Sequence, residues 1–547
     1  MLRRSVLYTI LAVLIIASLA LGGCTNTAQK SSNSNNKVAT LIFTQEPDTM
    51  NTMYTNMYYS QILQQAWDVW AWQYDDQNKP YPVLVTELPS IKNGDITADG
   101  KTITIHLRND IVWSDGQPIT SADFKFTYEM YINPKNTVAT TYPYSKVASL
   151  ETPDKSTVVM KFDEPFAPWL QFWKGILPEH VLKPIFDTDG TLDNASWNKA
   201  PTVGAGPFVF SEWQTGSFLR FVRNDKYWGK KSNLDQIFIR IVPDDASQVA
   251  ALKAGDADLG IFIAYPDIPP LEQAGVKIVS VNSGYSEGWF FNLGDKGNPA
   301  LKDVRVRQAL AIAIDRDKIA KDLLLGKTKP GASLWDKMPY VDPSLKPYAY
   351  DPAKAKQLLD EAGWTLGADG VREKDGVKLD LRYGTTTKDV RQSAQAIIQQ
   401  MLADVGVKVD LLNYDSDIFF ASYADKGPTY SGDLDIYEWS DVPTAFPDPD
   451  IAYWLCSEIP SDKNPQGLNA EFICDKKLDE LFQLQTTQVD LNQRVATFHE
   501  ITKLMYDQVY WLSLWLDPDI WALSNRLGNV KLSGSTPFYN IGEWTVK

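Results

Sequence analysis

Residues 99–124 of this 547-residue chain read DGKTITIHLRNDIVWSDGQPITSADF and contain the signals of a strand, a turn and a helix start. Thr102–Arg108 alternates polar and apolar side chains, which predicts a half-buried strand. Residues 115–118, Asp-Gly-Gln-Pro, form a turn sequence. Thr120 and Asp123 have the spacing of a capping box, so we expect a helix to begin there. This stretch therefore predicts a mixed α/β fold.

The same alternation of strand and helix signals continues along the chain. Isoleucine at 237, 239 and 241 predicts a second half-buried strand, and the helix after it should stop at Gly255. A strand–helix–strand unit is expected over residues 379–411. Alternation of this kind favours α/β lobes, and the length of the chain predicts more than one. Further helices are expected over residues 304–314, 315–326, 352–363 and 491–507.

The N-terminal residues have the pattern of an export signal. Arg3 and Arg4 precede an uncharged apolar run, residues 6–21, and Gly22-Gly23-Cys24 follows. The run is also near the lower length limit of a membrane-spanning helix, so an uncleaved anchor is the alternative. Residues 21–24, Leu-Gly-Gly-Cys, resemble the bacterial lipobox, in which the cysteine is lipidated and becomes the mature N-terminus. We therefore expect a lipoprotein signal peptide over residues 1–23.

The residues that follow Cys24 have no large apolar side chain until Val38. Residues 24–37 are accordingly expected to be the lipidated cysteine and a flexible tether. Two or more acyl chains hold a protein firmly to a membrane. The folded part would then be exported and anchored to the outer face of the cytoplasmic membrane.

Cys456 and Cys474 are the remaining cysteines of the sequence. An even pair in an oxidising compartment favours a disulfide, which would stabilise the chain by about 3 kcal/mol. The alternatives are two buried free thiols, or a pair of metal ligands that lacks partners. A zinc site is disfavoured because the three histidines, at 106, 180 and 499, are scattered.

Charge and motif content exclude several functions. The formal net charge of −15 excludes nucleic acid as a natural partner, since phosphate binding requires a basic surface. There is no Gly-x-Ser-x-Gly elbow or phosphate loop, and His499-Glu500 lacks the second histidine of a zinc helix. The acidic residues are numerous enough for the paired carboxylates of a glycoside hydrolase, but no motif supports that alternative. We expect neither catalysis nor a cofactor.

From about residue 38 to the end, the chain resembles bacterial extracellular solute-binding proteins of family 5, the receptors of peptide-type ABC importers that include oligopeptide- and dipeptide-binding proteins. The resemblance depends on the order and spacing of several segments rather than on one motif. These segments are residues 99–124, Gly204–Phe208 (GAGPF), Tyr227-Trp228, residues 251–258 (ALKAGDAD), Phe291-Asn292 and residues 303–316.

The resemblance implies an α/β fold of the periplasmic-binding-protein-like type II (cluster C), with three lobes and a hinged ligand cleft. Lobes I and III would close on the ligand, and the hinge would lie where the chain crosses between them. The implied boundaries are 38–59, 201–285 and 525–547 for lobe I, 60–200 for lobe II and 286–524 for lobe III.

The implied function is that of a substrate-binding lipoprotein of an ABC importer. It would capture short peptides between lobes I and III, as a monomer, and deliver them to a membrane permease with its ATPase subunits. An oligosaccharide receptor of the same family is an alternative, because the 18 tryptophans are compatible with stacking on sugar rings. A secreted glycoside hydrolase is the alternative from another functional class.

The family places the carboxylate that binds the peptide amine after a tryptophan, in a Trp-x-x-Asp…Asp-Pro run. A buried amine requires such a partner. Residues 438–450 read EWSDVPTAFPDPD, with a longer interval than in the peptide-binding members. Trp439 matches the tryptophan, Asp441 is the first candidate anchor and Asp448 the second. Alternatively, Trp439 is a core residue and Asp448 only shapes a turn. Two weaker candidates for ligand contact are Trp289, which would face the cleft, and Glu46.

Overall fold

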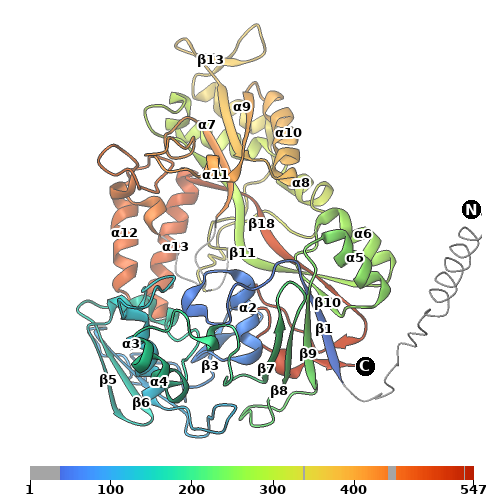
Figure 1. The fold of residues 1–547 in the computed structure, drawn as a ribbon. Coiled ribbons are helices and arrows are strands. Elements are labelled where there is room, and N and C mark those ends of the chain that lie inside the picture. Colours follow the sequence, from blue (N-terminus) through green and yellow to red (C-terminus); the bar gives the residue numbers. More distant parts are fainter. Residues whose placement is uncertain (1–36, 337–338, 442–450, 535) are drawn as a thin grey trace, which may run out of the picture. The chain divides into compact units, whose positions relative to one another are not determined.

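A mixed sheet of ten strands organises the described part of the chain, which comprises residues 37–336, 339–441, 451–534 and 536–547 of a computed structural model (Figure 1). These residues belong to one compact unit that begins at Lys37. The order of the strands does not follow the sequence, so distant segments of the chain lie side by side. The order is β16 (Lys408–Tyr414), β15 (Asp380–Thr386), β17 (Ile436–Asp441), β11 (Lys277–Phe291), β18 (Trp511–Leu523), β10 (Leu259–Gly260), β1 (Val38–Phe43), β9 (Gln236–Ile241), β8 (Phe218–Arg223) and β7 (Phe208–Gln214).

One end of this sheet, from β10 to β7, covers the first hydrophobic core. β1 pairs in parallel with β9 and β10, whereas β7, β8 and β9 are antiparallel. Apolar residues of β1 and β9 alternate into the core, as the isoleucines at 237 and 239 predicted. The helices of this region are α2 (Tyr58–Trp67), α5 (Asp245–Ala254) and α6 (Ile268–Gln273), and α5 ends at Gly255 as expected. β19 (Leu527–Gly528) and β20 (Thr545–Val546) pair near the C-terminus.

A second core lies under residues 99–124. The predicted strand is β4 (Thr102–His106), which pairs with β6 (Thr157–Lys161) beside β5 (Ser149–Asp154). Thr120 and Asp123 form the predicted capping box at the start of α3 (Ser121–Ile132). The cap satisfies backbone N–H groups that a helix start otherwise leaves unpaired. The other elements here are α4 (Glu179–Asp189), β2 (Trp72–Tyr74) and β3 (Pro80–Pro82).

The other end of the sheet, from β16 to β11, belongs to residues 277–523, which we call the last segment. β15, α10 (Asp389–Ala403) and β16 form the predicted strand–helix–strand unit, with the strands parallel. Asp303, Asp315 and Asp351 cap the helices that follow them. The helices are α7 (Val304–Ala313), α8 (Arg316–Asp322), α9 (Pro352–Glu361), α11 (Ser416–Phe419), α12 (Lys476–Thr487) and α13 (Leu491–Gln508), and the remaining strands are β12 (Thr365–Leu366), β13 (Arg372–Lys374) and β14 (Val377–Lys378).

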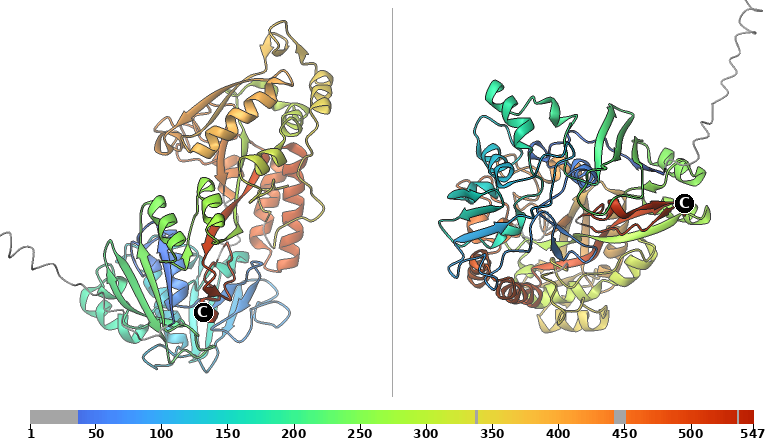
Figure 2. Two further views of the ribbon diagram at one scale, coloured as in Figure 1. Left: turned by 90° about the vertical axis from the view of Figure 1, so that its right-hand side faces the viewer. Right: turned by 90° about the horizontal axis from the view of Figure 1, so that it is seen from below.

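Two long antiparallel strands, β11 and β18, connect the two ends of the sheet (Figures 1 and 2). Ile520–Leu523 of β18 packs in the first core and its border, whereas Trp511–Trp515 packs in the cores of the last segment. Their pairing shifts register between Asn282 and Ser286, so the ladder is irregular between the two cores. A register shift bends and twists a strand pair locally. This irregular crossing is where rotation of one end against the other would be absorbed.

The lobe boundaries implied by the resemblance stay a prediction. Trp67 of α2 packs in the first core, as do Phe126, Leu182 and Trp197 of the segment expected to form lobe II. All four residues lie within 60–200, the segment expected to form lobe II, so the first core contains side chains of both expected lobes. Within the described residues, no helix is long and apolar enough to cross a membrane.

Candidate ligand-binding site

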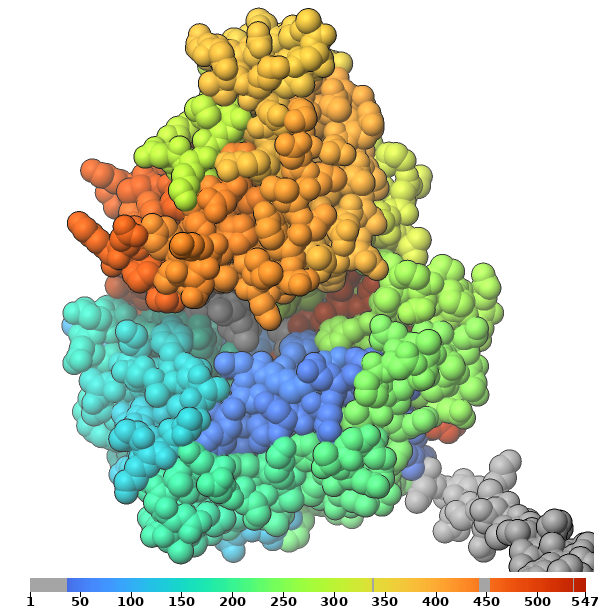
Figure 3. All heavy atoms as spheres, turned by 45° about the horizontal axis from the view of Figure 1, so that its top comes forward, coloured from blue at the N-terminus to red at the C-terminus, as the bar shows by residue number. Residues whose placement is uncertain are grey.

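A recess lies between the two ends of the sheet in the space-filling view. Figure 3 shows it between the orange residues of the last segment and the blue residues that include α2, with the dark red of β18 at its back. The residues considered below lie along β11, β17 and β18, where these strands cross between the cores. The crossing strands thus bring residues that are distant in sequence side by side.

Carboxylates gather at this crossing. β17 ends at Asp441, which is paired with Ser286 in the β11 ladder and is 8% exposed. Tyr285, the residue before Ser286, is 43% exposed. Burial raises the pKa of Tyr285, and the negative charges of Asp519, Asp441 and Asp517 raise it further. The three carboxylates therefore act on one exposed ring, and together they favour a cationic group beside Tyr285.

α2 contributes from the opposite side of the crossing. The Tyr58 hydroxyl, in the first turn of α2, donates a hydrogen bond of 3.5 Å to Asp519 Oδ2. Burial raises the pKa of Tyr58, with Asp519 adding to the shift, so Tyr58 is a neutral donor at physiological pH. The first lobe and the crossing strand β18 are thus in direct polar contact.

Asp517 connects the crossing to the interior of the last segment. The Trp515 indole Nε1 donates to Asp517 Oδ1 at 2.7 Å, and the Ser440 hydroxyl donates to Asp517 Oδ2. These two donors hold the side chain against β17. Asp517 is therefore placed by neutral hydrogen bonds rather than by a salt bridge among the described residues.

Behind Asp517 lies a buried ionic cluster. Arg391 of α10 donates two hydrogen bonds of 2.9 Å to the Glu287 carboxylate of β11. Glu438 of β17 accepts a hydrogen bond from the Tyr383 hydroxyl. Burial raises the pKa of Glu438 well above its usual range, and the charge of Glu287 raises it further. Glu287 therefore holds the negative charge beside Arg391, and Glu438 holds a proton.

Trp439 packs in the interior, which supports the core interpretation of this residue. Its ring is stacked on Phe290 with 3.8 Å between centroids and 18° between planes, and Phe419 and Phe420 approach it edge-on. One face of the indole is therefore covered by Phe290. A direct contact between Trp439 and a ligand stays a prediction, while its packing fixes the strand that carries Asp441.

Trp289 does not face the cleft in this structure, contrary to the expectation. Its side chain is 0% exposed and lies edge-to-face with Tyr383 at 5.1 Å. The reason is strand alternation, because successive side chains of β11 point to opposite faces of the sheet. Phe290 packs with Trp439, so Trp289 points into the core formed with α7 and α10. Trp289 is a core residue in this conformation.

Glu46 lies at a turn of the first lobe. Its Oε1 accepts hydrogen bonds from Trp213 Nε1 at 2.7 Å and from the Gly216 backbone N–H at 2.8 Å. These bonds hold the turn between β7 and β8, which is a structural role. Asp448 and Cys24, the second anchor candidate and the lipidation site, lie outside the described residues.

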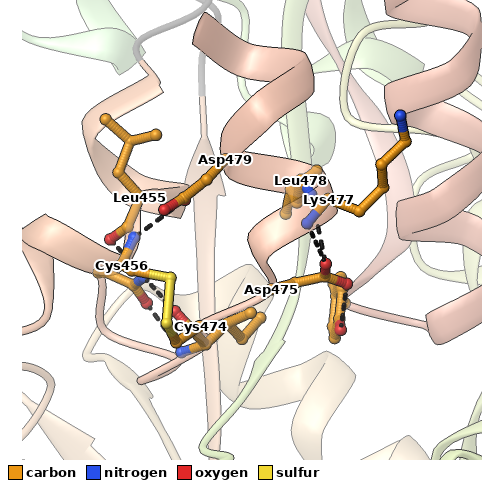
Figure 4. Close-up of a disulfide and its surroundings, with 10 residues drawn as sticks. Leu455, Cys456, Cys474, Asp475, Lys477, Leu478 and Asp479 are labelled. Carbon is orange, nitrogen blue, oxygen red and sulfur yellow. Dashed lines mark hydrogen bonds between the residues drawn. A yellow bond between two sulfur atoms is a disulfide. The ribbon is translucent and has the colours of Figure 1, made fainter.

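The predicted disulfide between Cys456 and Cys474 is confirmed (Figure 4). The Cys456 backbone N–H donates to Asp479 Oδ1 at 3.0 Å, and Asp475 accepts from backbone N–H groups at the start of α12. The bond therefore ties the segment after β17 to the first turn of α12. The described residues contain no group of three His, Cys, Asp or Glu side chains that could hold a metal ion.

Asp517, Asp519, Tyr285 and Tyr58 were missed by the sequence analysis. A signal for the two aspartates was present, because residues 511–523 read WLSLWLDPDIWAL and two acids interrupt an apolar strand. Local rules of this kind are often broken at functional sites. The tyrosines gave no such signal, since aromatic residues are common in this chain.

Comparison with known proteins assigns the chain to a class. The family model described as bacterial extracellular solute-binding proteins, family 5 Middle, matches residues 79–462. The oligopeptide-binding protein AppA of Bacillus subtilis is 26% identical over 567 residues, which cover 99% of both chains. The nickel-binding periplasmic protein of Escherichia coli is 26% identical over 460 residues, 81% of this chain and 84% of that protein.

The fold is also that of solved structures. The ABC transporter substrate-binding protein CtaP of Listeria monocytogenes has a TM-score of 0.77 and 24% identity, over 93% of this chain and 99% of that one. The type II periplasmic-binding fold expected from the sequence is confirmed. The chain is a solute-binding receptor of the kind that serves ABC importers, and not an enzyme. The chain belongs to the bacterial extracellular solute-binding proteins of family 5.

Proposed function

We propose that this receptor captures short peptides in the recess between lobes I and III and delivers them, as a lipid-anchored monomer, to the permease of its importer. The observation that carries the proposal is the group of carboxylates at the crossing of β11, β17 and β18. Asp441, Asp517 and Asp519 all act on Tyr285, which is exposed in this region. The N-terminal ammonium group of a peptide is a cation suited to such a site.

Asp441 is the anchor that the geometry favours among these carboxylates. It stands at the end of β17, the strand that Phe290 and Trp439 hold rigidly by stacking. A micromolar affinity corresponds to about −8 kcal/mol, which a charge-assisted contact of the amine and burial of the peptide backbone can supply.

Two observations favour a peptide over the alternatives. The relative AppA, which matches the full length of this chain, is named an oligopeptide-binding protein. The oligosaccharide alternative requires an open aromatic face, and Phe290 covers one face of Trp439.

The test is calorimetry of the purified protein with short peptides and with the same peptides acetylated at the amine. Asp441→Asn and acetylation should each weaken binding about tenfold or more, because each removes one partner of a charge-assisted hydrogen bond. Asp433→Asn is the matched control, since Asp433 lies on the same lobe and pairs at the surface with Lys296. Binding that is indifferent to both changes would remove amine recognition at Asp441. Saturable binding of oligosaccharides instead of peptides would support the sugar alternative.

The lipid anchor at Cys24 is the second part of the proposal, and it depends on the Leu-Gly-Gly-Cys sequence at residues 21–24. Cys24→Ser should release the protein from the membrane fraction or leave the signal peptide attached. Mass spectrometry of the membrane-bound protein should find a diacylglycerol on Cys24. Normal membrane retention and an unmodified mass would contradict the anchor.

A further inference from the structure

A small cavity lies between the end of α2 and the loop before α4. The volume of the cavity, counted as the space open to the centre of a water molecule, is about 10 Å³, which is roughly enough for one water. Its walls come from the first lobe, from α3 and from the loop before α4. The lining residues are Met50, Asn51, Thr52, Gln64, Trp67, Asp68, Tyr131, Gly175, Ile176, Leu177 and Trp197.

Asp68, the residue that ends α2, carries the one carboxyl group among these lining residues. It is 2% exposed. Its Oδ2 accepts a hydrogen bond of 3.2 Å from Gln64 Nε2, and Gln64 is oriented because its Oε1 accepts from Trp70 Nε1. Oδ1 has no hydrogen-bond partner among the described residues, and neither has the indole N–H of Trp67. A polar atom buried in this way is costly unless its charge is removed.

Gly175 shows that the loop before α4 approaches the end of α2 closely. Its φ of +133° is rarely adopted by a residue with a side chain. A Cβ atom there would lie 2.2 Å from Gln64 Nε2 and 3.2 Å from Asp68 Oδ2. The backbone of residues 175–177 is therefore packed directly against the Gln64–Asp68 pair, and any change of charge on Asp68 acts on this contact.

No cation offsets the charge of Asp68. The residues that line the cavity, all of them described, include no Lys, Arg or His, and the titratable group that faces Asp68 from α3 is Tyr131. Burial raises the pKa of Asp68 to about 7, although hydrogen bonds from the Val69 and Ile176 backbones and from Gln64 lower it in part. The proton is thus the ion that neutralises this site.

We propose that Asp68 is a proton-binding site between the end of α2 and the loop before α4, and that the contact between α2 and residues 175–177 is tightest with the proton bound. The neutral acid removes the buried charge and supplies an O–H donor to the cavity. An ionised Asp68 draws water toward Oδ1 and loosens the contact. Acidification of the surroundings of this exported receptor therefore tightens the contact between α2 and the loop before α4.

α2 extends this effect to the ligand site. The helix begins at Tyr58, whose hydroxyl donates to Asp519 at the crossing, and Asp68 follows its last residue. A ten-residue helix is about 15 Å long and moves as one piece. A change in the packing at the C-terminal end of α2 therefore also shifts Tyr58 and its contact with Asp519.

The first test compares the melting temperature of the full-length protein with that of Asp68→Asn between pH 4.5 and 8.5. The folding equilibrium of the wild type relative to the variant should fall by up to tenfold per pH unit up to about pH 7 and then level off. The sign follows from the raised pKa, because the folded protein holds a proton that the unfolded chain releases near its usual pKa. Asp110→Asn, an exposed change in lobe II, should give a curve parallel to the wild type.

The second test needs no variant and decides the matter if Asp68→Asn fails to fold. Hydrogen exchange of the wild type is measured by mass spectrometry at several pH values and corrected for the intrinsic rate. Protection of residues 58–68 and 171–178 should fall as pH rises from 5 to 8, while protection of α13 stays constant. Parallel melting curves, or protection of both segments that does not change with pH, would overturn the proposal.

Discussion

Two buried carboxyl groups of this receptor have raised pKa values for different reasons. Burial raises the pKa of Asp68 to about 7, with only neutral hydrogen-bond donors to oppose it. Burial also raises the pKa of Glu287 to about 7, although Arg391 binds it at 2.9 Å through two hydrogen bonds. Asp517 adds to the shift at Glu287. The Asp68 site lacks a cation, whereas the Glu287 site has one cation, Arg391, among several carboxyl groups.

The difference shows that a shared pKa does not imply a shared response to mutation. At Asp68, replacing the carboxyl by a neutral group removes the whole electrostatic cost. At Glu287, the same replacement leaves Arg391 as an unpaired buried charge, which is costly. The partners of a buried acid, rather than its pKa, therefore determine whether neutralisation stabilises the fold. Three substitutions test this comparison.

The largest effect is expected from Arg391→Leu. The substitution removes the cation that Glu287 needs and keeps the volume apolar, so the unfolding free energy should fall by about 3–5 kcal/mol at pH 7. Denaturant unfolding, followed by tryptophan fluorescence, measures the loss. As pH falls toward 5, the remaining carboxyl groups become protonated and need no cation. The loss of unfolding free energy should therefore shrink over this range.

Arg305→Leu is the matched control for Arg391→Leu. Arg305 is on α7 of the same lobe and pairs at the surface with Asp303, and it should show little change. A loss that is equal for the two arginine variants would contradict the role assigned to the buried pair.

An intermediate effect is expected from Gly175→Ala, which disturbs the Asp68 site without touching its charge. The added Cβ would overlap Gln64 Nε2, and the φ of +133° is unfavourable for alanine. We expect a loss of about 1–3 kcal/mol and a weaker pH dependence of stability than in the wild type.

Gly94→Ala separates these contributions. Gly94 also has a positive φ, but a Cβ there would meet no atom within 4 Å. Gly94→Ala should therefore lose only the free energy of placing alanine at a positive φ, and its stability should keep the pH dependence of the wild type. If both alanine variants retained the full pH dependence, the packing of Gly175 against Asp68 would not matter for the proton.

Much of the fold follows from local signals in the sequence. Thr120 and Asp123 cap α3, Asp303 caps α7, and Gly255 ends α5, as predicted, because each depends on a few neighbouring residues. The strand order could not be derived in this way. β11 and β18 are paired over more than 200 positions of separation, and nothing local to either strand specifies its partner.

The candidate site was only partly predictable for the same reason. The resemblance to the family indicated β17 and Asp441, but the assignment of Trp289 to the cleft was wrong for this structure because strand alternation turns its ring into the core. Asp68 carried no signal, since Asp in a sequence such as Gln-Ala-Trp-Asp-Val-Trp does not reveal that residues 175–177, distant in sequence, will cover it. Burial of a charge is a property of the assembled lobes.

The smallest effect is expected from Glu438→Gln, and it is the sharpest test of how the Arg391 cluster distributes its charge. Burial, with the charge of Glu287, raises the pKa of Glu438 well above its usual range, so the side chain is already neutral at pH 7. Glutamine has the shape of the neutral acid and can accept the hydrogen bond from Tyr383. The unfolding free energy should change by less than about 1 kcal/mol, whereas Glu287→Gln should cost about 3 kcal/mol or more by leaving Arg391 unpaired. Equal losses for the two glutamine variants, measured by the same denaturant unfolding, would mean that the negative charge is shared between the two glutamates. Glu287 would then resemble Asp68 more closely than its contact with Arg391 indicates.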